Sequence, residues 1–230
     1  MSLPSTPGWI AQGNSRAAVA RRRCAYLPRM TLSSEPFEAI AAAKAALRTT
    51  VKVRRDALSH EARAALSARI TARVLELDSY RAAKTVLAYS SFGSEFDTRA
   101  LIGHALAQGK TLLLPRVDRA SRTLTLHAVK DLARDLQPGV WGILEPNPQR
   151  APIMQVFDFK WILVPGLAFT PGCERLGYGA GFYDELIARC TQKPALVAAA
   201  FATQMVEDMP CTPADQRVDQ VVTEDKIYAR

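Results

Sequence analysis

The segment Trp161–Asp184, WILVPGLAFTPGCERLGYGAGFYD, constrains the fold of this chain more than any other stretch. It opens with an apolar run, Ile162–Val164, that is typical of a buried strand, and it turns at Pro165-Gly166. A glycine-rich loop follows, and over Phe182–Cys190 the apolar residues recur at the spacing of a helix. The order of strand, glycine loop and helix start is typical of a phosphate-binding segment.

The glycines of this segment favour close approach of the backbone to an anion. Five of the chain's 12 glycines lie between Gly166 and Gly181. Without side chains, Gly177, Gly179 and Gly181 are able to adopt positive φ and to turn backbone N–H groups toward a ligand. The start of the following helix adds donors and a favourable dipole. Glycines are also ordinary turn residues, so the loop alone supports either interpretation.

Two charged residues flank the loop. Arg175 precedes it and is suited to neutralise phosphoryl oxygens. Asp184 follows it and is suited to hold a magnesium ion whose other ligands are water and phosphate. Asp184 also has a simpler interpretation, as a first-turn carboxylate that complements the helix dipole. These residues leave both nucleotide binding and a structural loop open.

Val164–Phe169 and Arg175–Asp184 closely resemble the signature of the 5-formyltetrahydrofolate cyclo-ligase family, also called methenyltetrahydrofolate synthetases. Two positions depart from the pattern: the family often has glycine or lysine where Ala180 stands and tyrosine where Phe182 stands. The resemblance extends over 44–225. It implies a Rossmann-like fold and an ATP- and Mg²⁺-dependent cyclisation of 5-formyltetrahydrofolate to 5,10-methenyltetrahydrofolate, which releases ADP and phosphate.

Strand and helix signals alternate through the rest of the chain. Helices are predicted over 36–57 and 60–77. Short apolar runs predict strands at Val86–Tyr89, Lys110–Val117, Ala195–Phe201 and Gln220–Thr223. We therefore expect one α/β domain over 34–230, with a Rossmann-like, mainly parallel sheet and helices on both faces. The alternating segment 123–129 predicts a partly exposed strand, in a hairpin or in a side lobe.

The composition excludes a membrane-spanning chain and a disulfide framework. Of the 230 residues, 48% are apolar, which suffices for a sizeable core, yet no run approaches the roughly 18 apolar residues of a membrane span. The four cysteines, Cys24, Cys173, Cys190 and Cys211, show no C-x-x-C spacing, which favours a reducing compartment. We expect a cytoplasmic protein, monomeric or weakly dimeric, that acts on small molecules.

The net charge of +8 comes mostly from the N-terminus. Residues 1–30 contain five arginines and no acidic residue, which leaves 25 basic against 22 acidic residues, or +3, in the remainder. The remainder shows no recognised nucleic-acid motif, so we expect no nucleic-acid partner. Residues 1–33 predict a flexible tail. The tail is either an organellar transit segment or, the interpretation we favour, the result of a start codon assigned too early, with Met30 as the true initiator.

Three cations lie on one face of the first predicted helix. Lys44, Arg48 and Arg55 project within about 40° of one another. Three cations on one face are often a solvated stripe. The resemblance implies another role, because the family's Lys-x-x-x-Arg motif on this helix contacts ATP and falls on Lys44 and Arg48.

The segment after the strand Val86–Tyr89 contains the predicted substrate site. Glu95 lies near the carboxyl end of this strand, where open α/β sheets bind ligands. By position alone it is an exposed loop residue; the resemblance implies that its carboxylate accepts two N–H bonds from the pterin of the folate. Ser90 and Phe92 would line the same wall. Trp141 either stacks on the substrate or packs beneath its loop, and Arg116 faces either the same crevice or solvent.

The resemblance implies a second magnesium ligand beside Asp184. Asp215–Asp219 matches the family's D-x-x-V-D, whose first Asp is assigned to magnesium, so Asp215 is the predicted ligand and Asp219 is interpreted as structural. The predicted catalytic residues are Lys44, Arg48 and Arg175. The predicted ATP contacts are Lys44, Arg48, Arg175, Leu176, Gly177, Tyr178, Gly179, Ala180, Gly181, Phe182 and Tyr183. The predicted substrate contacts are Ser90, Phe92, Glu95, Trp141, Tyr178 and Phe182. The alternative is a sugar-phosphate isomerase or an acyl transferase whose glycine loop binds a substrate phosphate.

Overall fold

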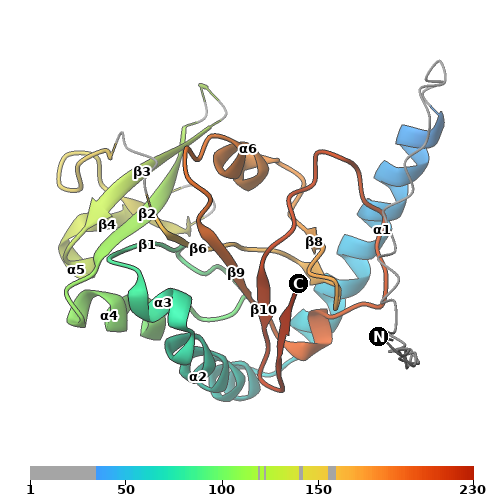
Figure 1. The fold of residues 1–230 in the computed structure, drawn as a ribbon, viewed down its shortest axis with the longest axis horizontal. Helices are drawn as coiled ribbons and strands as arrows, with labels where there is room; N and C mark the ends of the chain where they lie inside the picture. The colour runs from blue at the N-terminus through green and yellow to red at the C-terminus, as the bar shows by residue number, and fades with distance from the viewer. Residues whose placement is uncertain (1–34, 119, 122, 140–141, 155–158) are drawn as a thin grey trace, which may run out of the picture.

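The computed structural model describes residues 35–118, 120–121, 123–139, 142–154 and 159–230 (Figure 1). The helices in these ranges are α1 (Glu35–Asp56), α2 (His60–Glu76), α3 (Asp78–Ala82), α4 (Arg99–Ala107), α5 (Leu132–Asp135), α6 (Phe182–Ala188) and the 3-10 helix η2 (Ala202–Gln204). The strands are β1 (Thr85–Leu87), β2 (Thr111–Asp118), β3 (Thr123–Val129), β4 (Leu136–Pro138), β5 (Leu144–Pro146), β6 (Trp161–Leu163), β7 (Ala168–Phe169), β8 (Arg175–Leu176), β9 (Ala195–Ala199), β10 (Gln220–Val222) and β11 (Ile227–Ala229). None of these helices has the length and apolar character needed to cross a membrane.

Seven strands form one sheet in the order β11-β10-β9-β6-β1-β2-β3. From β10 to β2 the neighbouring strands pair in parallel, whereas the edge strands β11 and β3 run antiparallel to their neighbours. This confirms the Rossmann-like, mainly parallel sheet. The segment 123–129 is the edge strand β3 of the main sheet and forms a hairpin with β2, so it is not part of a side lobe. Its residues pair in register with β2 from Asp118↔Thr123 to Leu112↔Val129.

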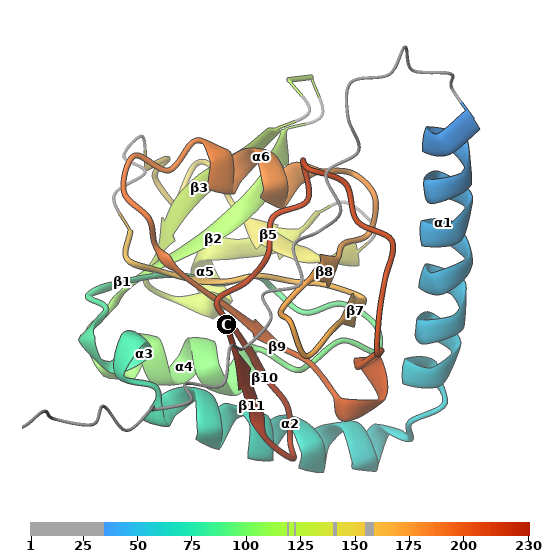
Figure 2. The same ribbon diagram turned by 45° about the vertical axis from the view of Figure 1, so that its right-hand side comes forward.

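Side chains alternate between the two faces of the sheet, so each strand contributes to two cores. In β1, Val86 packs into a core that includes Ile70 of α2 and Leu101 of α4. The next residue, Leu87, packs into a second core that includes Leu186 of α6. Figures 1 and 2 show α2, α3 and α4 along one side of the sheet and α6 on the other. Helices therefore cover both faces, as expected.

A small hairpin separates the main sheet from the glycine loop. After β6, the chain forms β7 and β8, which pair antiparallel. Cys173, in the turn between them, has φ 63°, a left-handed conformation that is unusual for a residue with a side chain. The glycine loop 177–181 begins directly after β8, so its start is fixed by this hairpin and not by a strand of the main sheet.

Helix α1 lies along the side of the molecule and packs against this hairpin (Figure 2). Val51 of α1 is fully buried in a third core with Ala168, Leu176 and Met209. Because Leu176 immediately precedes the glycine loop, this contact brings the cationic face of α1 to the loop.

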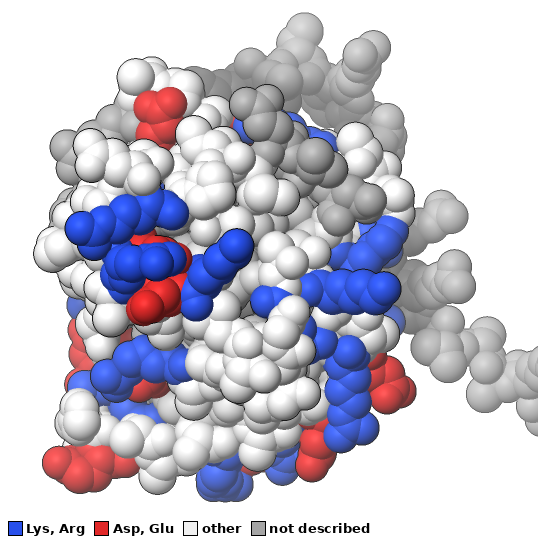
Figure 3. All heavy atoms as spheres, turned by 90° about the vertical axis from the view of Figure 1, so that its left-hand side faces the viewer, with Lys and Arg blue, Asp and Glu red and all other residues white. Residues whose placement is uncertain are grey.

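Basic and acidic side chains lie among one another on the face around β3, β4 and α5 (Figure 3). Arg134 of α5, whose side chain is 62% exposed, also has Nε 3.0 Å from Oδ1 of Asp135, which lies buried beneath the surface. Neighbouring charges of opposite sign partly cancel, which moderates the field of the basic residues on this face.

Candidate functional site

A cleft of about 830 Å³ lies where α1, the loop after β1 and the glycine loop meet. It opens beyond the carboxyl ends of β1 and β6, as ligand sites of open α/β sheets do. Its lining brings together these predicted residues: Lys44, Arg48, Ser90, Phe92, Glu95, Arg175, Leu176, Gly177, Tyr178, Gly179, Ala180, Gly181, Phe182, Tyr183, Asp184 and Asp215. Trp141, the remaining predicted residue, lies outside the described residues.

The three loop glycines are needed for two different reasons. Gly179 has φ 104° and Gly181 has φ 74°, in the region that favours glycine, as expected. Gly177 does not have positive φ; a Cβ atom there would lie 2.9 Å from Nη1 of Arg175, so a larger residue would require the guanidinium to shift. The loop backbone and the Arg175 guanidinium are thus in close contact. Helix α6 begins at Phe182 as predicted but ends at Ala188, two residues early.

Two cations of α1 reach the far side of the cleft. Lys44 Nζ lies 2.6 Å from Asp215 Oδ2, and Arg48 donates from Nε to the carbonyl oxygen of Gly177 at 2.8 Å. Partial burial alone would raise the pKa of Asp215, but hydrogen bonds from Lys44 and Thr212 outweigh burial and lower this pKa. Asp215 is therefore a carboxylate at neutral pH, paired with a cation.

Arg175 and Asp184 form a second pair at the base of the cleft. Nη2 of Arg175 lies 2.5 Å from Oδ1 of Asp184, which also accepts the backbone N–H of Gln216 at 3.1 Å. The Arg175 side chain is 4% exposed, and its Nε is a buried donor without a hydrogen-bond partner among the described residues. A guanidinium that lines the cleft is suited to bind an anion that enters it.

Glu95 lies at the other end of the cleft. Its Oε2 accepts the backbone N–H of Phe92 at 2.9 Å, and its Oε1 accepts the hydroxyl of Tyr178. Burial raises the pKa of Glu95, and the hydrogen bonds from Tyr178 and Phe92 and the positive charge of Arg55 oppose this increase. A carboxylate held by two donors still has free lone pairs for a ligand's N–H groups. Phe92, 49% exposed, offers an apolar ring beside it.

Sequence reasoning missed Arg55 as part of this end of the cleft. Arg55 is 4% exposed, donates from Nε to Ser94 Oγ at 3.0 Å and from Nη1 to the Tyr178 hydroxyl at 2.9 Å. Its place on the same helical face as Lys44 and Arg48 was the signal available in the sequence. Tyr89, which is buried and lines the cleft, was missed as well.

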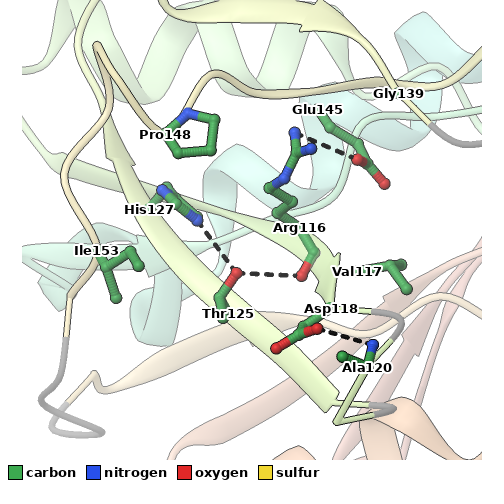
Figure 4. Close-up of a pocket in the computed structure, with 10 residues that line it drawn as sticks. All are labelled: Arg116, Val117, Asp118, Ala120, Thr125, His127, Gly139, Glu145, Pro148 and Ile153. Atoms are coloured by element: carbon green, nitrogen blue, oxygen red, sulfur yellow. Dashed lines mark hydrogen bonds and ion pairs between the residues drawn. The ribbon is translucent and has the colours of Figure 1, made fainter.

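A smaller hollow of about 610 Å³ adjoins the cleft and shares Val117 and Glu145 with it (Figure 4). Arg116 lines this hollow, where Nη1 donates to the Pro146 carbonyl at 3.0 Å and lies 3.5 Å from Glu145 Oε2. Arg116 therefore does not line the predicted crevice, and its side chain, 28% exposed, lies in the neighbouring hollow. His127 is also bonded within the protein, with Nδ1 2.8 Å from the Ala151 carbonyl oxygen, so this hollow has a structural explanation.

The described residues contain no group of three or more His, Cys, Asp or Glu side chains placed to hold a metal ion. Asp184 and Asp215 nevertheless line the same cleft, and the N–H of Gln216, the residue after Asp215, donates to Asp184. Carboxylate oxygens are the ligands that magnesium prefers, and magnesium usually keeps water and phosphate for the rest of its shell. The chemistry of this pair fits a magnesium ion that arrives with a nucleotide.

The fold and the cleft place this chain among α/β proteins that bind ligands at the carboxyl ends of parallel strands. Residues 40–224 match the 5-formyltetrahydrofolate cyclo-ligase family, and the chain belongs to this family. The resemblance stated from the signature is thereby confirmed.

Individual relatives agree with this assignment. The chain is 32% identical over 192 residues to the 5-formyltetrahydrofolate cyclo-ligase of Mus musculus, an alignment that covers 80% of this chain and 94% of the mouse protein. The NMR structure of Aquifex aeolicus 5,10-methenyltetrahydrofolate synthetase is similar with a TM-score of 0.71 and 32% identity, over 81% of this chain and 92% of that one. A 5,10-methenyltetrahydrofolate synthetase from Mycoplasma pneumoniae shares the fold, with a TM-score of 0.63 and 19% identity over 79% and 98% of the two chains.

Proposed function

We propose that this protein catalyses the ATP-dependent cyclisation of 5-formyltetrahydrofolate to 5,10-methenyltetrahydrofolate, with release of ADP and phosphate. The observation that carries the proposal is that one cleft contains both ends of the required site. Cations and a glycine loop form one end, and a partly buried carboxylate beside exposed aromatic rings forms the other. Family membership favours this reaction over the isomerase and acyl-transferase alternatives.

The phosphate end consists of Lys44, Arg48, Arg175 and the backbone of Leu176–Tyr183. Lys44 and Arg48 come from α1, and Arg175 comes from β8, so the triphosphate would lie between two separate elements. The Arg175 guanidinium lines the cleft and would face the transferring phosphoryl group. Arg48 and Arg175 are held by hydrogen bonds to backbone carbonyl oxygens before the ligand arrives, which lowers the reorganisation needed during the reaction.

The folate end consists of Glu95 with Ser90, Phe92, Tyr178 and Phe182. The pterin ring presents a flat edge of two N–H donors, which a carboxylate accepts in pairs. Glu95 would bind this edge while the rings of Phe92 and Tyr178, both about half exposed, pack against the pterin face. The predicted stacking role of Trp141 remains a proposal.

The reaction has two bond-forming steps. The formyl oxygen on N5 attacks the γ-phosphorus of ATP, and the bond from this phosphorus to the β-phosphate oxygen breaks to release ADP. N10 then attacks the activated formyl carbon and loses its proton, and the carbon–oxygen bond breaks to release phosphate. Neither step requires a protein nucleophile, so the protein contributes positioning and charge stabilisation.

Asp184 and Asp215 are the proposed magnesium ligands. When bound, magnesium would neutralise charge on the phosphates and orient them for the attack. Lys44 would then be released from Asp215 to contact a phosphate oxygen. We also propose the cytoplasm as the location, since Cys173 and Cys190 are free thiols.

Two substitutions that should each change the Michaelis constant of a different substrate test the proposal. Wild-type protein is incubated with 5-formyltetrahydrofolate and magnesium-ATP, and the near-ultraviolet absorbance of the conjugated methenyl product is followed with and without ATP. Arg48→Gln should raise KM for ATP, and Glu95→Gln should raise KM for the folate, each by roughly tenfold or more because each loses a charge-assisted bond. Glu207→Gln, an exposed control, should change neither. A folded wild-type protein without ATP-dependent product formation would refute the proposal.

A further inference from the structure

A hydrogen-bond bridge connects α1 to the carboxylate at the folate end of the cleft. Nη1 of Arg55 donates to the hydroxyl oxygen of Tyr178, and this hydroxyl donates its own proton to Oε1 of Glu95. The three side chains come from α1, the glycine loop and the loop after β1. The Tyr178 hydroxyl thus accepts a hydrogen bond from a guanidinium and donates one to a carboxylate. Each of these two hydrogen bonds polarises the other.

Arg55 also holds the backbone segment that presents Glu95. Its Nε donates to Ser94 Oγ at 3.0 Å, and Ser94 Oγ in turn donates to Asp56, the residue that follows Arg55 on α1. Ser94 immediately precedes Glu95. The Arg55 guanidinium therefore contacts both Tyr178, whose hydroxyl bonds Glu95, and Ser94, the residue next to Glu95. A planar group with several fixed donors is suited to this double role, and a lysine is not.

The other titratable groups near Glu95 do not supply the positive charge that Arg55 supplies. Tyr89, Tyr178 and Tyr183 surround the carboxylate, and burial together with the Glu95 charge raises the pKa of each of these hydroxyls, so they are neutral at physiological pH. Asp56, behind Ser94, is negative, because its hydrogen bonds to Lys52 and Ser94 lower its pKa. Among these groups Arg55 is the cation that opposes the cost of ionising a partly buried Glu95.

We propose that Arg55 is a positioning residue for substrate binding: through the Tyr178 hydroxyl and Ser94 it keeps Glu95 ionised and aimed into the cleft to receive the N–H edge of the reduced folate. This inference rests on the proposed function, in which Glu95 binds the pterin. Arg55 itself need not touch the substrate. Its effect is on binding of the folate and not on transfer of the phosphoryl group.

The direct test follows the carboxyl carbon of Glu95 by NMR in protein labelled with ¹³C-glutamate, with Glu95→Gln identifying the signal. Removing the Arg55 charge should move the titration midpoint of Glu95 upward by about one pH unit. Arg55→Gln is compared with Arg54→Gln, which removes the same charge from the exposed neighbouring position and should leave the midpoint in place. Tyr178→Phe keeps the ring, breaks the bridge, and should move the midpoint in the same direction.

A midpoint that stays at its wild-type value in the folded Arg55→Gln and Tyr178→Phe proteins would overturn the proposal, as would an equal shift in Arg54→Gln. If Arg55→Gln does not fold, as judged by circular dichroism, the Tyr178→Phe titration decides alone. These measurements need no substrate, so they remain decisive even if the wild-type protein has no cyclo-ligase activity, an outcome that would refute the proposed function separately.

Steady-state kinetics test the link to substrate binding. In Arg55→Gln, KM for 5-formyltetrahydrofolate should rise more at pH 6 than at pH 8, because the higher midpoint leaves less Glu95 ionised at the lower pH. We expect kcat and KM for ATP to change by less than about threefold, since the phosphate end of the cleft is untouched. An equal rise in KM at both pH values would indicate general damage to the cleft and contradict the proposed role.

Discussion

Lys44 and Asp215 are 171 positions apart in the sequence, yet Nζ of Lys44 lies 2.6 Å from a carboxylate oxygen of Asp215. The pair joins α1 to the loop that precedes β10. In the proposed function the two residues have different ligands, phosphate for Lys44 and magnesium for Asp215. Each neutralises the other while the cleft is free of nucleotide, and in that proposal the nucleotide and its metal would replace both halves of the pair.

Asp215→Asn should raise the magnesium concentration needed for half-maximal activity by roughly tenfold, because a neutral amide binds magnesium more weakly than a carboxylate. At saturating magnesium kcat should recover in part. Titration of magnesium at fixed ATP measures the effect. Asp208→Asn, an exposed carboxylate that does not line the cleft, is the matched control and should behave as wild type. An unchanged magnesium requirement in Asp215→Asn would remove this residue from the metal site.

Arg175→Lys should lower kcat by about 10²-fold, the size of effect seen when a donor to developing charge is removed. Lysine keeps the charge but loses the fork that reaches Pro165 O at 3.2 Å and Asp184 at 2.5 Å. Arg217→Lys is the control, since Arg217 pairs with Glu174 at 2.7 Å outside the cleft. Thermal melting separates a catalytic loss from a damaged fold; normal turnover by a folded Arg175→Lys protein would exclude the proposed role.

The central strands were predictable because they are buried on both faces and therefore appear as continuous apolar runs. In β6, for example, Ile162 packs into one core and Leu163 into the other. The edge strand β11 (Ile227–Ala229) has exposed and half-buried residues, and no such run marks it. The hairpin of β7 and β8 has two residues in each strand, too few for any period.

The site shows the same limit, since long-range contacts leave no local pattern. Arg55 was recognised as one of three cations on α1, but its partners Ser94 and Tyr178 are 39 and 123 positions away.

Arg116 was predictable in retrospect from the alternation of side chains along β2. Pro115 and Val117 line the cleft, so the side chain between them points to the other face, where the smaller hollow lies.

Gly177→Ala should lower turnover by roughly tenfold or more, because the new Cβ would lie 2.9 Å from Arg175 Nη1 and displace the guanidinium from its position at the phosphate end. Gly103→Ala in α4 is the matched control. Nothing lies within 4 Å of a Cβ at Gly103, and alanine in a helix interior should stabilise the fold by about 0.5–1 kcal/mol. Thermal melts and kcat of both variants check the pair. Wild-type turnover by Gly177→Ala would show that Arg175 tolerates the displacement.

Glu95 should lower the stability of the fold at neutral pH, because burial raises the pKa of its carboxyl above that of an unfolded chain. Such a group contributes stability that is fully present below the unfolded pKa and is lost as the pH rises through the folded pKa. Glu95→Gln does not titrate, so its melting temperature should exceed that of wild type at pH 7.5.

The difference between Glu95→Gln and wild type should shrink toward pH 4, where Glu95 is mostly protonated in both the folded and the unfolded chain. Melting curves across this pH range measure it, with the exposed Glu207→Gln as a control that should follow wild type throughout. A Glu95→Gln protein no more stable than wild type at pH 7.5 would mean that Arg55 and Tyr178 offset the whole burial penalty. A stabilised variant that binds folate poorly would instead show that this carboxylate is kept for binding at the expense of stability.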